Sequence, residues 1–299
     1  MSQLLTLDVP VGARVGPLVT ARGDFAAVDA RPATPDRCAG TVLLVPGFMG
    51  SKEDFLPLLA PLSRAGLRAV AIDGRGQYET ARLHRSGPSA SPDSYALDQL
   101  AGDLVALAES LGGGPVHLLG HSYGGLIARA ALLRTRGDAA LWRSLTLMNF
   151  GPGAVAPAQR DRLRLLLAAL DSMTLADIWP FLGNDASDGP AHVPPEVRDF
   201  SRTRWLANDP AQVRAAAEQL LEEPDRSAEL AELDTPVAVV SGSPDLTWPA
   251  EGVARMAHAL GARLVTVPDG GHSPNVHAPE RTAAALVEFW RSLRTPSAR

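Results

Sequence analysis

Several residue types are scarce in this sequence of 299 residues. It has one cysteine, Cys38, and one lysine, Lys52, and aromatic residues make up 5 % of the chain. A single cysteine excludes an internal disulfide bond and any zinc or iron–sulfur site built from several cysteines. The lone lysine follows Gly50 and Ser51 at a spacing that differs from a phosphate-binding loop, which excludes a P-loop ATPase.

An excess of charge of one sign and a long apolar run are also absent. The 28 basic and 33 acidic residues give a net charge of −5 and are mixed along the chain, so we expect no nucleic-acid partner. The N-terminus meets Asp8 before an apolar segment could form, and we expect no signal peptide. The charge-free stretch 110–128 is interrupted by glycines and a proline, which is not typical of a membrane span. We therefore expect a soluble, cytoplasmic protein with no membrane partner, while no pattern points to a particular oligomeric state.

The composition is that of a chain that can bury a core. It is 45 % apolar, and its 27 glycines and 25 prolines follow no collagen period. Short runs rich in Val, Leu and Ile alternate with longer segments of helical apolar spacing, which predicts βαβ units and a buried parallel sheet. We expect strands at residues 41–45, 68–72, 116–119, 144–148, 236–240 and 263–267. We expect helices at residues 54–64, 97–111, 124–134, 250–260 and 279–293.

Two parts of the chain depart from this alternation. Residues 4–9 and 25–29 are strand-like and predict antiparallel edge strands ahead of the first βαβ unit. From residue 151 to residue 224 there is no strand pattern, only helical segments at 161–170, 195–205 and 212–222. This predicts a helical insertion between two strands. Its aromatic residues either line an apolar pocket or form the insertion's own core, and they are Trp179, Phe181, Phe200 and Trp205.

The strongest indication of chemistry is the segment Gly120-His121-Ser122-Tyr123-Gly124-Gly125. It lies directly after the apolar run 116–119 and directly before a helical run, so Gly-x-Ser-x-Gly stands between a strand and a helix. A nucleophile on such a sharp turn has a strained backbone, and side chains two positions to either side would collide with it. The pattern therefore predicts Ser122 as a nucleophile. The alternative is a glycine-rich turn that only packs a helix against a strand.

A serine hydroxyl needs a base that is held by an acid, and both follow Ser122 in the expected order. His272 lies in a glycine-flanked loop after the last predicted strand, and Asp245 lies just after strand 236–240. Both stand past the carboxyl ends of neighbouring strands, where open parallel sheets form ligand sites. His277 is the main rival for the base. Asn149, at the end of strand 144–148, is expected to line the site but has no charge to serve as the acid.

A tetrahedral intermediate also needs hydrogen-bond donors aimed at its oxyanion. One predicted donor is the backbone N–H of Tyr123, which follows the nucleophile at a helix N-terminus. The other is the backbone N–H of Phe48, in a loop where Gly47 and Gly50 permit a close approach. The Phe48 side chain would then form one wall of the acyl pocket. The alternative for this loop is an ordinary turn between a strand and a helix.

The segment Asp73-Gly74-Arg75-Gly76-Gln77-Tyr78-Glu79 also follows a predicted strand and begins with Gly-x-Gly. It does not fit a dinucleotide-binding turn, because Glu79 stands where the third glycine would be and no helix is predicted between this segment and residue 97. We instead expect Asp73 and Arg75 to fix this loop by hydrogen bonds and an ion pair.

Together these residues resemble the α/β-hydrolase superfamily over nearly the whole chain. The matching segments are Pro46-Gly47-Phe48, Asp73-Gly74-Arg75-Gly76, Gly120 to Gly125, Asp245 and Gly270-Gly271-His272. The resemblance implies an eight-stranded, mostly parallel sheet in a core of residues 1–151 and 226–299, with a helical cap of residues 152–225 inserted after the sixth strand. Two positions differ from the family pattern. Pro46 stands where many members have histidine, and the usual Arg-Gly-His-Gly is here Arg75-Gly76-Gln77-Tyr78.

The resulting hypothesis is a hydrolase without cofactor or metal that cleaves a small-molecule carboxylic ester through Ser122, His272 and Asp245. Haloalkane dehalogenases and soluble epoxide hydrolases of this fold use aspartate as nucleophile, so Ser122 argues against both. Hydrolysis of C–C, thioester or amide and peptide bonds, perhydrolysis and acyl transfer remain alternatives, and a non-catalytic ligand-binding protein is a further one. Arginines of the insertion could bind an acidic group but are interpreted as solvated helix faces, and they are Arg160, Arg162, Arg164, Arg198, Arg202 and Arg204.

Overall fold

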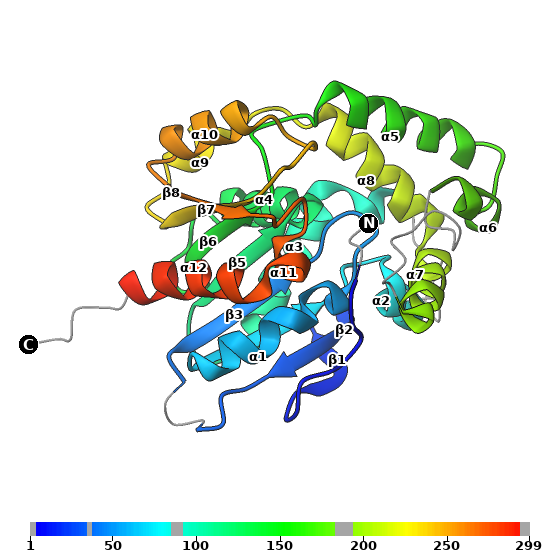
Figure 1. Ribbon diagram of the computed structural model, residues 1–299. Helices are drawn as coiled ribbons and strands as arrows, with labels where there is room; N and C mark the ends of the chain where they lie inside the picture. Colours follow the sequence, from blue (N-terminus) through cyan, green and yellow to red (C-terminus); the bar gives the residue numbers. More distant parts are fainter. Residues whose placement is uncertain (1–3, 35–37, 85–91, 183–193, 294–299) are drawn as a thin grey trace, which may run out of the picture.

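A sheet of eight strands runs through the centre of the molecule (Figure 1). The computed structural model describes residues 4–34, 38–84, 92–182 and 194–293, and its strands stand in the order β1-β2-β4-β3-β5-β6-β7-β8. β2 pairs antiparallel with β1 and β4, and the remaining pairs are parallel. The strands are β1 (Arg14–Thr20), β2 (Gly23–Ala30), β3 (Gly40–Val45), β4 (Leu67–Ile72), β5 (Val116–His121), β6 (Trp142–Met148), β7 (Val237–Ser243) and β8 (Arg263–Pro268). The predicted α/β class and mostly parallel sheet are confirmed.

The six strands predicted from apolar runs are β3 to β8, and their burial explains why the pattern revealed them. Every residue of β5 is buried, because helices cover both faces of the sheet there. The edge of the sheet was predicted less well. Residues 4–9 form no strand, and the edge strand is β1, in which Val15 and Val19 are 58 % and 72 % exposed. An exposed edge strand that contains Pro17 has no continuous apolar run to indicate it.

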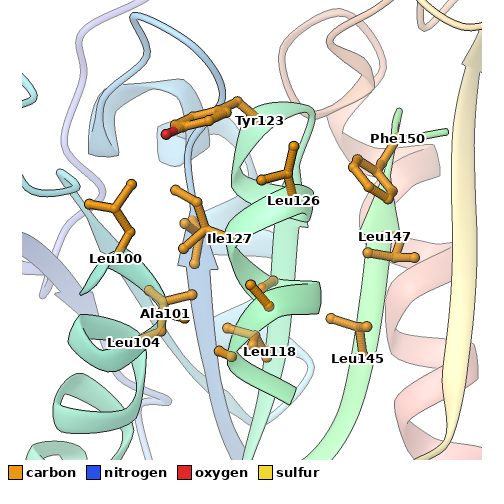
Figure 2. Close-up of a cluster of buried hydrophobic side chains, with 14 of the residues drawn as sticks. Leu100, Ala101, Leu104, Leu118, Tyr123, Leu126, Ile127, Leu145, Leu147 and Phe150 are labelled. Atoms are coloured by element: carbon orange, nitrogen blue, oxygen red, sulfur yellow. The ribbon is translucent and has the colours of Figure 1, made fainter. Parts of the chain in front are cut away.

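Helices pack on both faces of the sheet. On one face, α1 (Leu56–Arg64) and α12 (Pro279–Ser292) pack against strand residues such as Leu44 and Val240. On the other face lie α3 (Leu97–Leu111), α4 (Tyr123–Arg134) and α10 (Ala250–Ala259). Figure 2 shows part of this second core, in which side chains of α3 and α4 meet those of β5 and β6. These two apolar layers hold the loops at the carboxyl ends of β5 to β8 in place.

The described residues between β6 and β7 form helices joined by turns and loops, with no strand among them. They contain α5 (Pro157–Leu170), α6 (Leu175–Ile178), the 3₁₀ turn η4 (Trp179–Leu182), α7 (Pro195–Ala207), α8 (Pro210–Glu222) and α9 (Ser227–Ala231). The three helices predicted there fall within α5, α7 and α8. α5 and α8 lie side by side at one end of the molecule (Figure 1). Among the described residues, no helix has the length and apolar character needed to cross a lipid bilayer.

Three further short helices follow sheet strands. They are η2 (Lys52–Phe55) after β3, α2 (Tyr78–His84) after β4 and α11 (Pro274–His277) after β8, and η3 (Pro92–Tyr95) precedes α3. The expectation of no helix between the turn after β4 and residue 97 was therefore wrong. The N–H groups that begin α2 are capped from a distance, because Glu79 N–H donates to Asp73 Oδ2 and Tyr78 N–H to Asn208 Oδ1. No local capping residue marks this helix in the sequence.

Candidate active site

Ser122 occupies a strained turn between β5 and α4. Its φ is +53° and its ψ is −121°, values that non-glycine residues rarely adopt. A Cβ atom at Gly120 would lie 2.3 Å from the Gly124 carbonyl oxygen, and one at Gly124 would lie 2.4 Å from the Val45 carbonyl oxygen. Both glycines are therefore sterically required. The clash at Gly124 is with the end of β3, so this glycine also brings β3 close to the turn.

Side chains from the loops after β7 and β8 meet at Ser122. His272 Nε2 lies 3.0 Å from Ser122 Oγ, and His272 Nδ1 lies 3.0 Å from Asp245 Oδ1 and 3.1 Å from Oδ2. Ser122, Asp245 and His272, which follow β5, β7 and β8, thus form one hydrogen-bonded series. Such a series can accept the proton of a serine hydroxyl and return it to a leaving group.

The Asp245 carboxylate is held ionised by its neighbours. Burial alone would raise its pKa, but hydrogen bonds from His272, Asn149 and the Thr247 N–H outweigh burial and lower the pKa to about 2. An ionised Asp245 favours the tautomer of His272 with its proton on Nδ1. That tautomer leaves the Nε2 lone pair facing Ser122 Oγ.

Asn149 does not line the site in the way that the sequence suggested. Its side chain is 1 % exposed, and its Nδ2 donates to Asp245 Oδ2 at 2.9 Å and to the Gly271 carbonyl at 3.0 Å. Its Oδ1 accepts the Gly242 N–H at 2.9 Å. Asn149 therefore lies behind Asp245 and fixes the acid, because all its polar atoms face the two loops rather than a cavity.

The other nearby histidines have structural contacts. His121 Nε2 lies 2.7 Å from the His272 carbonyl oxygen, and burial together with the nearby His272 lowers the pKa of His121 to about 3. It is therefore neutral and donates to that carbonyl. His277, the rival base, has its Nδ1 3.4 Å from the Gly270 carbonyl oxygen. The imidazole in contact with Ser122 is that of His272.

Two backbone amides flank Ser122. Tyr123 is the first residue of α4, where N–H groups have no partner within the helix. Phe48 lies in the loop after β3, and this loop approaches so closely that a Cβ at Gly47 would lie 3.2 Å from Ser122 Cβ. Within the described part of the chain, neither amide donates to another protein group. These are the two donors that the sequence analysis assigned to an oxyanion.

The turn after β4 is bonded to the loop after β3, which carries Phe48. Asp73, fully buried, accepts the Lys52 N–H at 2.8 Å and lies 3.2 Å from Lys52 Nζ. Arg75 forms an ion pair with Asp103, with 2.6 Å between Nε and Oδ2. The expected hydrogen bonds are present, and Asp73 and Arg75 each form an ion pair with a residue of another element, Lys52 of η2 and Asp103 of α3. The turn thus connects the loop after β3 to α3.

A cavity of about 360 Å³ opens beside Ser122, between the insertion and the carboxyl ends of the strands. Its walls are mainly apolar, and its polar lining comes from Gln159, Arg162 and Thr247 together with Ser122 and its histidines. The apolar lining is formed by Phe48, Met49, Val155, Leu163, Leu166, Leu182, Leu220 and Trp248. A larger cavity of about 1180 Å³, between η3, α6 and α8, shares none of these residues.

Phe48 lines the cavity as expected, but the aromatic residues of the insertion do not. Trp179 and Trp205 are 6 % and 0 % exposed in the insertion's own core, where Trp205 Nε1 donates to the Leu175 carbonyl at 2.6 Å. Phe181 is 78 % exposed. The aromatic residue missed by sequence reasoning is Trp248, three positions after Asp245. Its position in the same loop as Asp245 could have indicated that it lies near the site.

The comparisons with known proteins agree with this geometry. The sequence profile of the Alpha/beta hydrolase family matches residues 42–285. The chain belongs to the alpha/beta hydrolase family. It is 29 % identical over 237 residues to "Putative carbamate hydrolase RutD" of Pseudomonas syringae pv. syringae, covering 73 % of this chain and 80 % of that protein.

Two further proteins that are similar to this chain are named esterases. The pimeloyl-[acyl-carrier protein] methyl ester esterase of Stenotrophomonas maltophilia is 33 % identical over 187 residues, covering 60 % of this chain and 70 % of that protein. The malate-bound structure of a thermophilic esterase from Thermogutta terrifontis superimposes with a TM-score of 0.71 and 26 % identity, covering 95 % and 100 % of the two chains. The hydrolase class of the sequence hypothesis is thereby confirmed.

Proposed function

We propose that this hydrolase cleaves small-molecule carboxylic esters through an acyl-serine intermediate. The observation that carries the proposal is the hydrogen-bonded series from Ser122 through His272 to Asp245. Its geometry matches what nucleophilic acyl transfer requires, because the base contacts the nucleophile and the acid holds the base. The same roles were predicted from the sequence on different grounds, namely the motif around Ser122 and the order along the chain.

In the proposed mechanism, His272 Nε2 takes the proton of Ser122 as Oγ attacks the ester carbonyl carbon. The carbonyl oxygen gains the negative charge, and the N–H groups of Phe48 and Tyr123 donate to it. The intermediate then collapses, the C–O bond to the alcohol breaks, and His272 returns the proton to the leaving alkoxide. A water molecule, deprotonated by His272, repeats the attack on the acyl-serine and releases the acid.

The cavity supports esters with a small or medium apolar part. Eight apolar side chains line about 360 Å³, a volume at the lower end of small-molecule sites. The names of the two esterases and of RutD describe cleavage at a carbonyl carbon that is bonded to oxygen or nitrogen. Carbamate hydrolysis is the second candidate, because RutD proteins from several bacteria are similar to this chain.

Active-site labelling tests the proposal. Wild type and Ser122→Ala are treated with a fluorophosphonate, and intact mass measures the number of labels per chain. We expect one label on wild type and none on Ser122→Ala, with the circular dichroism spectrum unchanged. In parallel, hydrolysis of p-nitrophenyl esters from acetate to decanoate is compared with hydrolysis of p-nitrophenyl carbamates. A folded wild type that neither labels nor hydrolyses any of these esters contradicts the proposal, and faster turnover of carbamates selects the second candidate.

A further inference from the structure

Gln77 connects the turn after β4 to the loop that carries Phe48. Its side chain is 2 % exposed, and both ends of its amide are used. Nε2 donates to the Gly47 carbonyl oxygen at 2.9 Å, and Oε1 accepts the Gly74 N–H at 2.9 Å. Gly74 follows β4 by two residues, so its bond to Oε1 fixes the Gln77 amide close to the end of that strand. The bond from Nε2 then holds the loop after β3 against the turn after β4.

The Gly47 carbonyl and the Phe48 N–H belong to a single peptide group. This group is planar and trans, so its C=O and N–H point in opposite directions. A donor that holds the Gly47 oxygen therefore also sets the direction of the Phe48 N–H. In a low dielectric, a hydrogen bond accepted at the C=O also polarises the N–H on the other side of the group.

Gly47 needs such support because its backbone is intrinsically free. Glycine has no Cβ to restrict its dihedral angles, and a Cβ here would crowd Ser122 and His121. The Gly50 N–H also donates to the Gly47 oxygen, at 3.0 Å, but it belongs to the same loop and would move with it. Gln77 is the contact to this oxygen that comes from another element.

The turn that carries Gln77 is itself hydrogen-bonded to the helical insertion. The Asp209 N–H donates to the Gly76 carbonyl at 2.9 Å, and Asn208 Oδ1 accepts the Tyr78 N–H at 3.3 Å. A Cβ at Gly76 would lie 2.6 Å from Gln212 Cβ, so the two segments are in tight contact. The residues on both sides of Gln77 are thus hydrogen-bonded to the link between α7 and α8.

We infer that Gln77 is a positioning residue that aims the Phe48 N–H at the oxyanion of the transition state. The inference rests on the proposed serine-esterase function. Gln77 stands where the family pattern Arg-Gly-His-Gly has histidine. The inference thus gives a role to the turn after β4, which resembled an incomplete dinucleotide-binding turn in the sequence. It predicts that losing the donor weakens transition-state binding and leaves substrate binding almost unchanged.

The test uses two substitutions that keep the size of the side chain. Gln77→Met removes both hydrogen bonds. Gln77→Glu keeps an acceptor for the Gly74 N–H but, when ionised, has no donor for the Gly47 oxygen. Thr80→Val is the matched control, because Thr80 is fully buried in α2 next to this turn and bonds Ala26 and Asp73 rather than Gly47. Circular dichroism and thermal unfolding establish that all variants are folded at the assay temperature.

The readouts are kcat and KM for p-nitrophenyl butanoate and the Ki of a trifluoromethyl ketone, whose serine adduct carries an oxyanion. For both Gln77 variants we expect kcat to fall roughly 10- to 100-fold, less than the 10²–10³-fold cost of deleting an oxyanion donor, with KM within about twofold. The Ki should rise by the same factor as kcat falls. Thr80→Val should keep kcat and Ki within about twofold of wild type.

Two results would overturn the inference without touching the proposed function. One is a kcat of both Gln77 variants within twofold of wild type, and the other is a loss of kcat that Thr80→Val shares or that leaves Ki unchanged. If wild type itself neither hydrolyses the ester nor binds the ketone, the proposed function has failed instead. Labelling of Ser122 separates the two cases, because slow but stoichiometric labelling of the Gln77 variants requires an intact nucleophile.

Discussion

Asp245 illustrates how single residues combine in this site. Burial of a carboxylate would normally favour its protonated form, yet donors from three different residues reverse that effect and lower the pKa to about 2. Asn149 provides one of these donors and also bonds Gly242 at the end of β7 and Gly271 in the loop after β8. The acid is therefore charged at every pH at which the protein is expected to work.

The low pKa of Asp245 predicts a pH dependence of stability. A carboxyl group whose pKa is lower in the folded than in the unfolded chain stabilises the fold above its ordinary pKa, and this stabilisation is lost as the pH falls towards the folded value. With a pKa of about 2 against an ordinary 3.8, the loss between pH 5 and pH 3 is about 1 kcal/mol. Urea unfolding of wild type and Asp245→Asn should show their difference in unfolding free energy shrinking by that amount. A difference that is constant or grows as the pH falls contradicts the assigned pKa.

At the scale of elements, α7 is fastened to the loop after β3 by a buried ion pair. Arg204 in α7 and Asp54 in η2 are both fully buried, with 2.6 Å between the guanidinium Nη1 and Oδ1. Burial raises the pKa of Asp54, and the guanidinium opposes this rise. Asp54 also accepts the Ser51 N–H. The pair thus joins the insertion to the segment that begins with Gly47 and Phe48.

Breaking this pair should be costly. Arg204→Met leaves a buried carboxylate without its partner, and we expect a loss of about 3 kcal/mol in unfolding free energy. The double variant Arg204→Met, Asp54→Asn should lose less unfolding free energy than the two single variants lose in total, because no uncompensated charge remains. Arg164→Met is the control, since the Arg164 and Asp161 side chains of that pair on α5 are 63 % and 70 % exposed and contribute no more than about 0.5 kcal/mol. Equal effects of the two arginine substitutions would contradict this assignment.

The elements also show which features a sequence reveals. β5 was predicted because full burial on both faces gives a continuous apolar run, and Ser122 because its strained turn requires glycines at fixed positions. α2 was missed because its first N–H groups are capped by Asp73 and Asn208, one of which lies 130 residues away from its partner. Arg204 was interpreted as a solvated residue for a similar reason, because its partner Asp54 lies 150 residues away. Contacts of this kind leave no local pattern.

At the scale of the whole molecule, the cavity beside Ser122 is formed by segments that are far apart in the sequence. Phe48 follows β3, Leu163 and Leu166 belong to α5, Leu220 belongs to α8, and Trp248 follows β7. The meeting of Ser122, His272 and Asp245 could be predicted from order along the chain, because parallel strands bring their carboxyl ends to one edge. The cavity could not, because it depends on how the insertion packs over that edge. For the tryptophans of the insertion the sequence left a pocket and the insertion's own core as alternatives, and they fill that core.

If the proposed ester hydrolysis takes place here, the size of this cavity limits the length of the acyl chain, and α5 offers a controlled way to change that size. Leu166 faces the cavity and is 9 % exposed, whereas the adjacent Leu165 is 72 % exposed. In Leu166→Trp the larger side chain should occupy part of the cavity, and one methylene in such a pocket is worth about 1–3 kcal/mol of discrimination. We expect kcat/KM for p-nitrophenyl octanoate to fall at least about tenfold, because losing the space for even one methylene costs about that factor. The kcat/KM for p-nitrophenyl acetate should stay within about threefold of wild type. Leu165→Trp adds the same side chain to the outer face of the helix and should leave the chain-length profile unchanged. If both variants keep the wild-type profile, the acyl chain does not enter this cavity.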